Sequence, residues 1–185
     1  KSTPSKHEEL KDDHEHRLWQ YFGAPGDNTT ISISNYTWIY QWIASDDGVK
    51  QGYWKEYLGT SPLTNFMGYA ITQADNPSYE WTTTPINQNN PVSWKGGDYI
   101  FANSYLAPIN VAAFDENDFE GNVLRTFYIF NTGSWTQWDN AVRKEDNQAL
   151  TGSQTSGQYT AISVLSAPNL NPNTDPTTIA PMQGV

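Results

Sequence analysis

Short apolar and aromatic runs, separated by clusters of Gly, Pro, Asn and Asp, fill most of the chain from residue 18 onward. The clearest run covers residues 37–43, where alternate positions carry Trp38, Tyr40 and Trp42 on one side and Ile39 and Gln41 on the other. A period of two places these two sets on opposite faces of an extended strand. Because turn-forming clusters divide such runs, the pattern predicts an all-β protein.

Apolar runs and turn-forming clusters alternate along the rest of the chain as well. We expect strands at residues 18–24, 37–43, 52–58, 66–72, 78–84, 99–103, 124–131, 158–165 and 178–182. We expect turns or loops at residues 25–28, 115–122 and 143–157. A short helix around residues 111–118, with Asn110 as its N-cap, is also expected. Since no long helical period is present, the prediction is an antiparallel β-sandwich with little helix.

The order of motifs occurs twice, which predicts a β-sandwich built from two pseudo-repeated halves, about 18–84 and 97–185. Residues 19–25 match residues 99–108, and residues 38–42 match residues 127–131. Residues 53–57 match either 135–138 or 159–162, and residues 63–69 match residues 179–185, which places the two Met at equivalent positions.

The final motif differs between the halves. After Gly68 the first half continues as an expected strand, whereas the second half reaches Gly184 and Val185. We therefore expect that Val185 is not a natural end and that a neighbouring strand keeps an unpaired edge. The continuation of this polypeptide, or a strand from another chain, would fill that edge.

Residues 1–17 differ from the rest, because they are rich in charge and contain a single strongly apolar residue, Leu10. All three His lie there. Such a segment cannot bury enough apolar surface to offset its ordering entropy, so we expect a charged flexible tail or linker before a domain at 18–185. His14 and His16, beside Asp12 and Asp13, could grip a divalent metal, although metal sites need ligands held in place.

Composition narrows the function classes. The formal net charge of −10 disfavours contacts with nucleic-acid phosphates. No apolar run approaches the roughly 20 residues of a membrane-spanning helix, and Cys is absent. The 8 Trp, 11 Tyr and 7 Phe are unusual for the length and favour strands and contact surfaces.

Catalytic constellations are weak. Outside residues 1–17 the chain has neither His nor Cys, so no Ser–His or Cys–His arrangement is available there. Scattered carboxylates, Asp46, Asp47, Glu56, Asp115, Glu116, Asp118 and Glu120, occupy turn-rich regions where such groups are usually solvated. Residues 115–122 are rich in oxygen ligands for calcium but lack EF-hand spacing. We expect no enzymatic activity, no cofactor and no metal.

Four segments resemble a module of large secreted and cell-surface proteins of Bacteroidota. They are residues 97–111 (GDYIFANSYLAPINV), 127–135 (FYIFNTGSW), 157–162 (GQYTAI) and 179–185 (IAPMQGV). Ala102-Asn103-Ser104 replaces the Gly-Asn-Pro of that module, and its terminal Phe-Val strand is missing. The resemblance implies a β-sandwich-like domain, export across the outer membrane, a cell-surface or secreted location, and no catalytic residues.

Two functions remain open. The first is a structural, adhesive or assembly module whose partner is the rest of its own polypeptide or another surface or outer-membrane protein. The second is a glycan-binding module, with Trp135 and Trp138 as stacking rings beside Asp139 and Asn140. The alternation of Tyr53, Trp54, Tyr79 and Trp81 suits packing instead, and we expect most rings to fill the core between two sheets.

Overall fold

The computed structural model describes residues 20–32, 37–44, 52–73, 80–93, 97–131, 158–171 and 177–185. In these ranges the strands are β1 (Gln20–Gly23), β2 (Asp27–Ile31), β3 (Thr37–Ile43), β4 (Tyr53–Glu56), β5 (Gly68–Gln73), β6 (Trp81–Thr84), β7 (Ile109–Asn110), β8 (Thr126–Asn131), β9 (Gln158–Ser163) and β10 (Thr178–Ile179). Three 3-10 helices accompany them: η1 (Val111–Ala113), η2 (Glu116–Asp118) and η3 (Ala167–Asn169).

All strand pairings are antiparallel, and the larger sheet has the order β1-β5-β3-β4. Three two-stranded sheets join β2 to β6, β7 to β10 and β8 to β9. Helix in the described ranges is limited to three turns of 3 residues each. The predicted all-β, antiparallel class is therefore confirmed.

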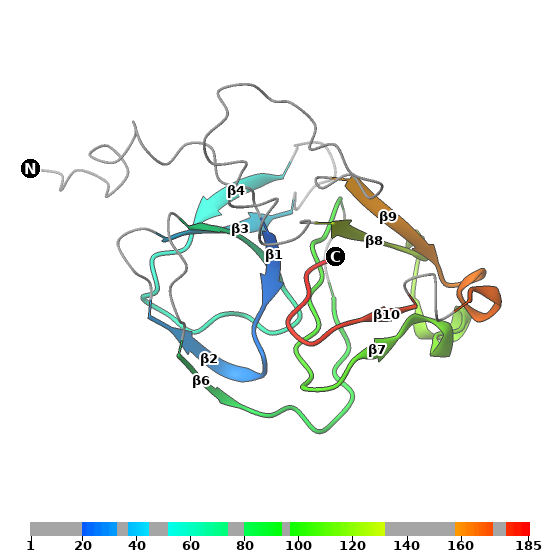
Figure 1. Ribbon diagram of the computed structural model, residues 1–185, viewed down its shortest axis with the longest axis horizontal. Helices are drawn as coiled ribbons and strands as arrows, with labels where there is room; N and C mark the ends of the chain where they lie inside the picture. The colour runs from blue at the N-terminus through cyan, green and yellow to red at the C-terminus, as the bar shows by residue number, and fades with distance from the viewer. Residues whose placement is uncertain are drawn as a thin grey trace, which may run out of the picture.

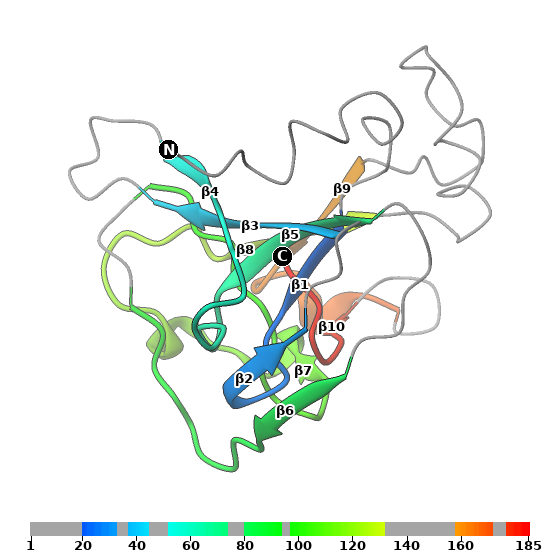
Figure 2. The same cartoon turned by 90° about the vertical axis from the view of Figure 1, so that its left-hand side faces the viewer.

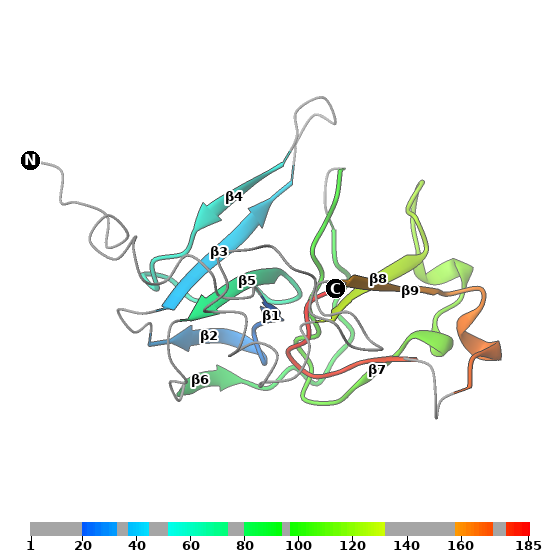
Figure 3. The same cartoon turned by 45° about the horizontal axis from the view of Figure 1, so that its top comes forward.

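The strands form two layers (Figures 1 and 2). The four-stranded sheet and the β8–β9 pair lie in the upper layer, and the β2–β6 and β7–β10 pairs lie below them. Figure 3 shows the strands of residues 20–84 beside those of residues 109–179. Each half thus contributes one upper and one lower sheet.

Each half also has its own apolar core. In the first half, Ile31 of β2, Ile39 of β3 and Tyr69 of β5 pack with Ala24 and Leu63, and all five are buried. In the second half, the buried cluster consists of Val111, Ile129, Ile162, Val164, Ala167 and Ile179. Both clusters lie between an upper and a lower sheet, so burial of apolar surface holds the two layers of each half together.

Four short segments join the halves into a ring, which we call the central ring: residues 21–23, 66–69, 100–103 and 182–185. Residues 21–23 pair with β5 on one side and with residues 182–184 on the other, through the bridge between Phe22 and Gln183. Residues 100–103 bridge in the same way to Met67 and to Gly184. Each segment therefore has a neighbour from its own half and one from the other half.

The hydrogen bonds of the central ring come in related pairs. Gly23 N donates to Met182 O over 2.8 Å, and Ala102 N donates to Phe66 O over 3.2 Å. Gly68 N donates to Ile100 O over 2.7 Å, and Gly184 N donates to Tyr21 O over 3.3 Å. The two acceptors Phe66 and Met182 are also two of the three non-glycine residues with positive φ, at 57° and 63°, in the described ranges.

Buried polar side chains fix this ring. Asn103 is fully buried, and its Nδ2 donates to Ala107 O and Ile179 O, each over 2.9 Å. Ser104 is also fully buried, and its Oγ accepts from Phe66 N over 2.8 Å. Since every one of these buried groups has a partner, the irregular backbone at the centre of the molecule carries little desolvation penalty.

Several expected boundaries were wrong, for local reasons. Residues 25–28 were expected to be a turn, but β2 begins at Asp27 and pairs with β6 across an irregular register. The segment 99–103 makes isolated bridges in place of a regular strand. The segment 178–182 is a strand only at Thr178–Ile179, because the backbone turns before Met182, where φ is positive.

The short helix expected at 111–118 divides into η1 and η2. The predicted N-cap is confirmed, because Asn110 Oδ1 accepts from Ala112 N over 3.0 Å. Extended backbone at Phe114 and Asp115 interrupts the helix. Asp115 is the N-cap of η2, and an N-cap has non-helical backbone. The helix therefore cannot continue from η1 into η2.

Candidate functional site

The outer face of the upper layer carries the most prominent group of exposed aromatic side chains. In β3 the inward residue is Ile39, which is 1% exposed, while Trp42 lies on the opposite face. Trp42 is paired directly with Trp54 of β4, which is 39% exposed. The β3 alternation was predicted, but the aromatic set lies outside the core.

Five rings form what we call the outer aromatic cluster: Tyr21, Trp42, Trp54, Phe130 and Tyr159. The Tyr21 and Trp54 rings are stacked, with centroids 6.2 Å apart and planes 10° apart. Tyr21 also contacts Phe130 at 5.2 Å, and Phe130 contacts Tyr159 at 5.1 Å. The cluster therefore runs from β3 and β4 of the first half to β8 and β9 of the second half.

Polar atoms tie the cluster together at its centre. The hydroxyl oxygens of Tyr21 and Tyr159 lie 3.0 Å apart and share a hydrogen bond. Burial, followed by this bond to Tyr159, raises the pKa of Tyr21 well above its ordinary value. At the other end, Trp42 Nε1 donates to Asp98 O over 2.9 Å. The cluster is neutral, so it is suited to apolar and stacking contacts rather than to acid–base chemistry.

Exposure differs across this face. Tyr159 is 53% exposed, whereas Tyr53, which is 58% exposed, lies on the other face of β4, because it pairs with Ile43 while Trp54 pairs with Trp42. Tyr128 of β8 is 44% exposed. A contiguous exposed aromatic surface of this kind is typical of contact sites for other macromolecules or for sugar rings.

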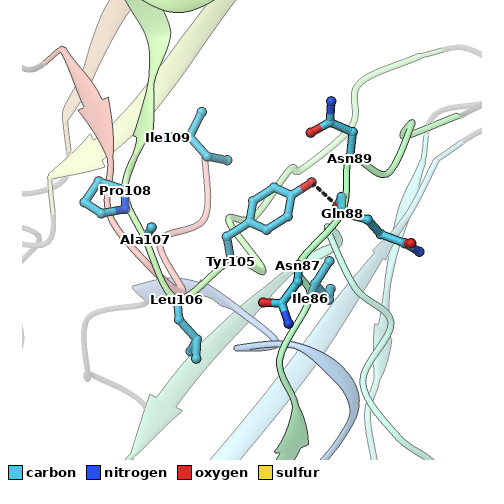
Figure 4. A pocket seen from close by; sticks show the side chains of 9 residues that line it. All are labelled: Ile86, Asn87, Gln88, Asn89, Tyr105, Leu106, Ala107, Pro108 and Ile109. Carbon is cyan, nitrogen blue, oxygen red and sulfur yellow. Dashed lines mark hydrogen bonds between the residues drawn. The ribbon is translucent and has the colours of Figure 1, made fainter.

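A shallow depression of about 450 Å³ lies elsewhere, between residues 86–89 and 105–109. Figure 4 shows the Tyr105 ring directed at the backbone of Gln88, where its hydroxyl donates to Gln88 O over 3.1 Å. Asn90 N donates to the same hydroxyl over 3.3 Å. The lining holds amides and apolar groups but no charged side chain, and Tyr105 uses its hydroxyl to hold the connecting segment.

The structure leaves several predicted residues undescribed. Trp135, Trp138, Asp139 and Asn140, the expected glycan-binding residues, lie outside the described ranges. So do residues 1–17 with their three His, and the carboxylates Asp46 and Asp47. The glycan and tail predictions for these residues stay predictions.

The acidic segment 115–122 is described and uses its carboxylates internally. Asp115 Oδ1 accepts from Asn117 N over 2.7 Å, and Asp118 Oδ2 accepts from Asp115 N over 2.8 Å. Glu116 lies 3.8 Å from Arg125 in an exposed ion pair. Among the described residues, no group of three or more His, Cys, Asp or Glu is placed to hold a metal ion. Two of these carboxylates therefore cap a helical turn.

The expectation for the aromatic residues was wrong in part. Among the described aromatic side chains, Phe66 and Tyr69 are buried, and Trp81 packs partly buried against the first core. Tyr53 and Trp54 are exposed, contrary to the packing expectation. The sequence signal for the outer aromatic cluster was the period of two in residues 37–43, but alternation alone does not say which face meets the core.

The fold and this face define a β-rich module with a neutral aromatic surface. No family model and no solved structure matches the chain. Among curated proteins, it is similar to the minor fimbrium subunit Mfa5 of Porphyromonas gingivalis, with 30% identity over 164 residues. The similarity covers 79% of this chain and 12% of the length of that subunit. The chain is thus related to part of a surface protein of the Bacteroidota, in agreement with the resemblance of its motifs.

No helix among the described residues has the length and apolar character needed to cross a membrane.

Proposed function

We propose that the chain is a non-catalytic module of a larger secreted or cell-surface protein, with a structural or adhesive role. The observation that carries the proposal is the similarity to a minor fimbrium subunit, which extends over 164 residues and 79% of the chain. Its partners would be the rest of its own polypeptide or another surface or outer-membrane protein. No catalytic function is proposed, because the carboxylates of Asp115 and Asp118 form the capping box of η2.

The geometry supports a role in contact and assembly. The central ring links the two halves through backbone hydrogen bonds. The outer aromatic cluster crosses both halves, so a partner that covers it would contact both of them. Exposed Trp and Tyr rings are favoured at protein interfaces, because they bury large areas at low entropic cost.

We also propose that the halves 18–84 and 97–185 are two copies of one ancestral unit. Support comes from the related hydrogen bonds, in which Tyr21 and Gly23 correspond to Ile100 and Ala102. The positive φ values of Phe66 and Met182 correspond in the same way. For the third motif, the pairing of β9 with β8 favours residues 159–162 over 135–138 as the counterpart of β4.

The location is tested by inserting an epitope tag after Gly121 in the gene of the source organism. Gly121 lies at an exposed turn, and no atom lies within 4 Å of a Cβ placed there. Antibody should label intact cells, and the tagged protein should be recovered with filaments sheared from the surface. Labelling that requires cell lysis would contradict a surface location.

The contact role is tested by Trp54→Ala and Tyr159→Ala, which remove exposed rings of the outer aromatic cluster. We expect unchanged surface amounts but loss of recovery with sheared filaments or loss of adhesion. Leu165→Ala is the matched control, because Leu165 is 76% exposed and lies outside the cluster. Equal losses in all three variants would argue against the cluster as the contact face.

A glycan-binding function is the second candidate, and the stacked, partly exposed Tyr21 and Trp54 rings favour it. Flat rings of this kind stack on sugar faces. The purified chain is applied to a glycan microarray beside Trp54→Ala. Binding of a defined glycan that the variant loses would support this candidate, and no binding would remove it.

A further inference from the structure

Among the described residues, no third strand pairs with the strand pair β8–β9 on its β8 side, which we call the open edge of β8. In the first half, β3 lies between β4 and β5, but its counterpart β8 pairs with β9 alone among the described residues. Ile39 of β3 and Ile129 of β8 are the buried inward residues of their strands, at 1% and 9% exposure. Within the ranges that the structure describes, no strand therefore occupies the place beside β8 that β5 occupies beside β3.

The backbone groups at this edge can be assigned from the register. Val164 N donates to Arg125 O over 3.0 Å, so alternate residues from Arg125 direct their backbone groups toward β9. The residues between them, Thr126, Tyr128 and Phe130, direct their N–H and C=O groups to the opposite edge. These correspond to the β3 positions that face β5, because Tyr57 N donates to Ile39 O on the β4 side.

Gly184 and Val185 lie next to the space beside β8 that corresponds to the place of β5 beside β3. Phe101 N donates to Val185 O over 2.9 Å, and Val185 N donates to Phe101 O over 2.8 Å, which repeats the pairing of Phe22 with Tyr69. Tyr69 then continues as β5 between β1 and β3. Val185 packs against the second core together with Phe101 and Phe127, whose rings lie 6.1 Å apart. Figure 1 shows the C-terminal residue close to the arrowhead of β8.

We propose that the open edge of β8 receives an extended strand that continues in register from Val185, between residues 98–101 and β8. The strand would run antiparallel to both neighbours, as β5 does, and would complete a second sheet in the same order as β1-β5-β3-β4. This inference rests on the proposed repeat and on continuity with the existing pairing of Val185. It assigns the edge to this polypeptide rather than to a separate chain.

The side-chain requirements of the strand follow from β5. Ala70, opposite Tyr40 and Tyr21, is 4% exposed, and Ile71 lies opposite Ile39 and packs against the first core. The residue after Val185 should therefore be small, because the aromatic face covers it. The next residue should be apolar and should extend the second core.

The test appends alanine, isoleucine, threonine and glutamine after Val185, copying Ala70–Gln73 of β5. Amide hydrogen exchange of Thr126, Tyr128 and Phe130 is measured by NMR in the original and the extended chains. We expect exchange of these amides to slow by about tenfold or more in the extended chain, with a higher Tm. A matched extension, with proline in place of alanine and threonine, should give neither change, because proline cannot donate to a ladder.

Each other outcome overturns the proposal. If both extensions give the same protection, the gain does not come from strand pairing. If the unextended chain already protects the three amides, either as a dimer by light scattering or as a monomer, then another copy or another segment covers the edge. Tyr128→Pro in the extended chain should remove the gain, since it deletes a donor at the open edge but no bond to β9. These readouts are independent of surface location and adhesion, so failure here leaves the proposed function intact.

Discussion

At the scale of single residues, close contacts between backbones decide where side chains are tolerated. A Cβ at Gly23 would lie 2.2 Å from Ala102 Cβ, and one at Gly68 would lie 2.2 Å from Ile100 Cγ2. A Cβ at Gly184 would lie 2.7 Å from Tyr21 Cβ. The glycines of the central ring are therefore required by space, because two halves meet there at backbone distance.

The pair Gly23 and Ala102 gives a direct test of that contact. Gly23→Ala should lower the free energy of unfolding by about 2 kcal/mol, because the new methyl overlaps with Ala102. Ala102→Gly alone should cost about 1 kcal/mol. In the double variant the methyl group moves from position 102 to position 23. The decrease in the free energy of unfolding should therefore be close to that of Ala102→Gly alone. Additive losses in chemical denaturation would show that the two positions are not coupled.

Two half-buried tyrosines make the stability of the fold depend on pH in the alkaline range. Burial, and then the hydrogen bond with Tyr159, raises the pKa of Tyr21, and burial raises the pKa of Tyr99 to about 12. In the unfolded chain both phenols ionise near their ordinary pKa of 10.0. Their contribution to stability is therefore full below pH 10 and is lost as the pH rises through the higher folded values.

We expect Tyr21→Phe to make the loss of stability between about pH 8 and about pH 11 smaller. The free energy of unfolding is measured at both values by chemical denaturation. Tyr53→Phe is the control for removal of a tyrosine hydroxyl as such, since Tyr53 is 58% exposed. If the free energy of unfolding of Tyr21→Phe depends on pH as strongly as that of the wild type, the ionisation of Tyr21 is not linked to unfolding.

At the scale of elements, the sequence predicted regular strands well and irregular ones poorly. The boundaries predicted for β3 were right, because alternation over 37–43 is undisturbed. β2 was missed, because Pro25, Gly26 and Asn28 are typical turn residues, yet β6 pairs with the segment that follows. The pairing partners are separated by between 50 positions (Ile31 and Trp81) and 57 positions (Asp27 and Thr84), so local propensity does not reveal the pairing.

The candidate site shows the same limit. Alternation in β3 correctly separated the aromatic set from Ile39, but the direction of the core depends on which other segments complete the layer. Tyr21 joins Phe130 and Tyr159 only because the central ring brings the halves together. A cluster assembled from β1, β3, β4, β8 and β9 leaves no contiguous motif in the sequence.

At the scale of the whole molecule, two separate cores are coupled through one ring of backbone hydrogen bonds. Ile39→Ala in the first core and Ile162→Ala in the second each remove a side chain that is 1% exposed. Each should lower the free energy of unfolding by about 3 kcal/mol. Because every segment of the ring bonds to the other half, we expect a single cooperative transition in all cases.

Calorimetry combined with NMR signals from both halves checks this coupling. Both variants should shift one common midpoint, with resonances of β3 and β8 lost together. Two transitions, or an Ile162→Ala variant whose first half melts at the original temperature, would show that the ring does not couple the cores. Ile39→Val is a milder control and should shift the same midpoint by a smaller amount.

The position of residues 182–184 between β1 and residues 101–103 also sets an order of events during synthesis. β1 is among the first strands to leave the ribosome, yet one of its edges is filled only when Met182, Gln183 and Gly184 arrive. The first half can assemble its core early, but it must wait with an exposed strand edge, and contacts of such long range form slowly. Misassembly with other nascent chains is therefore most probable in this interval, and the arrival of residues 182–184 ends it.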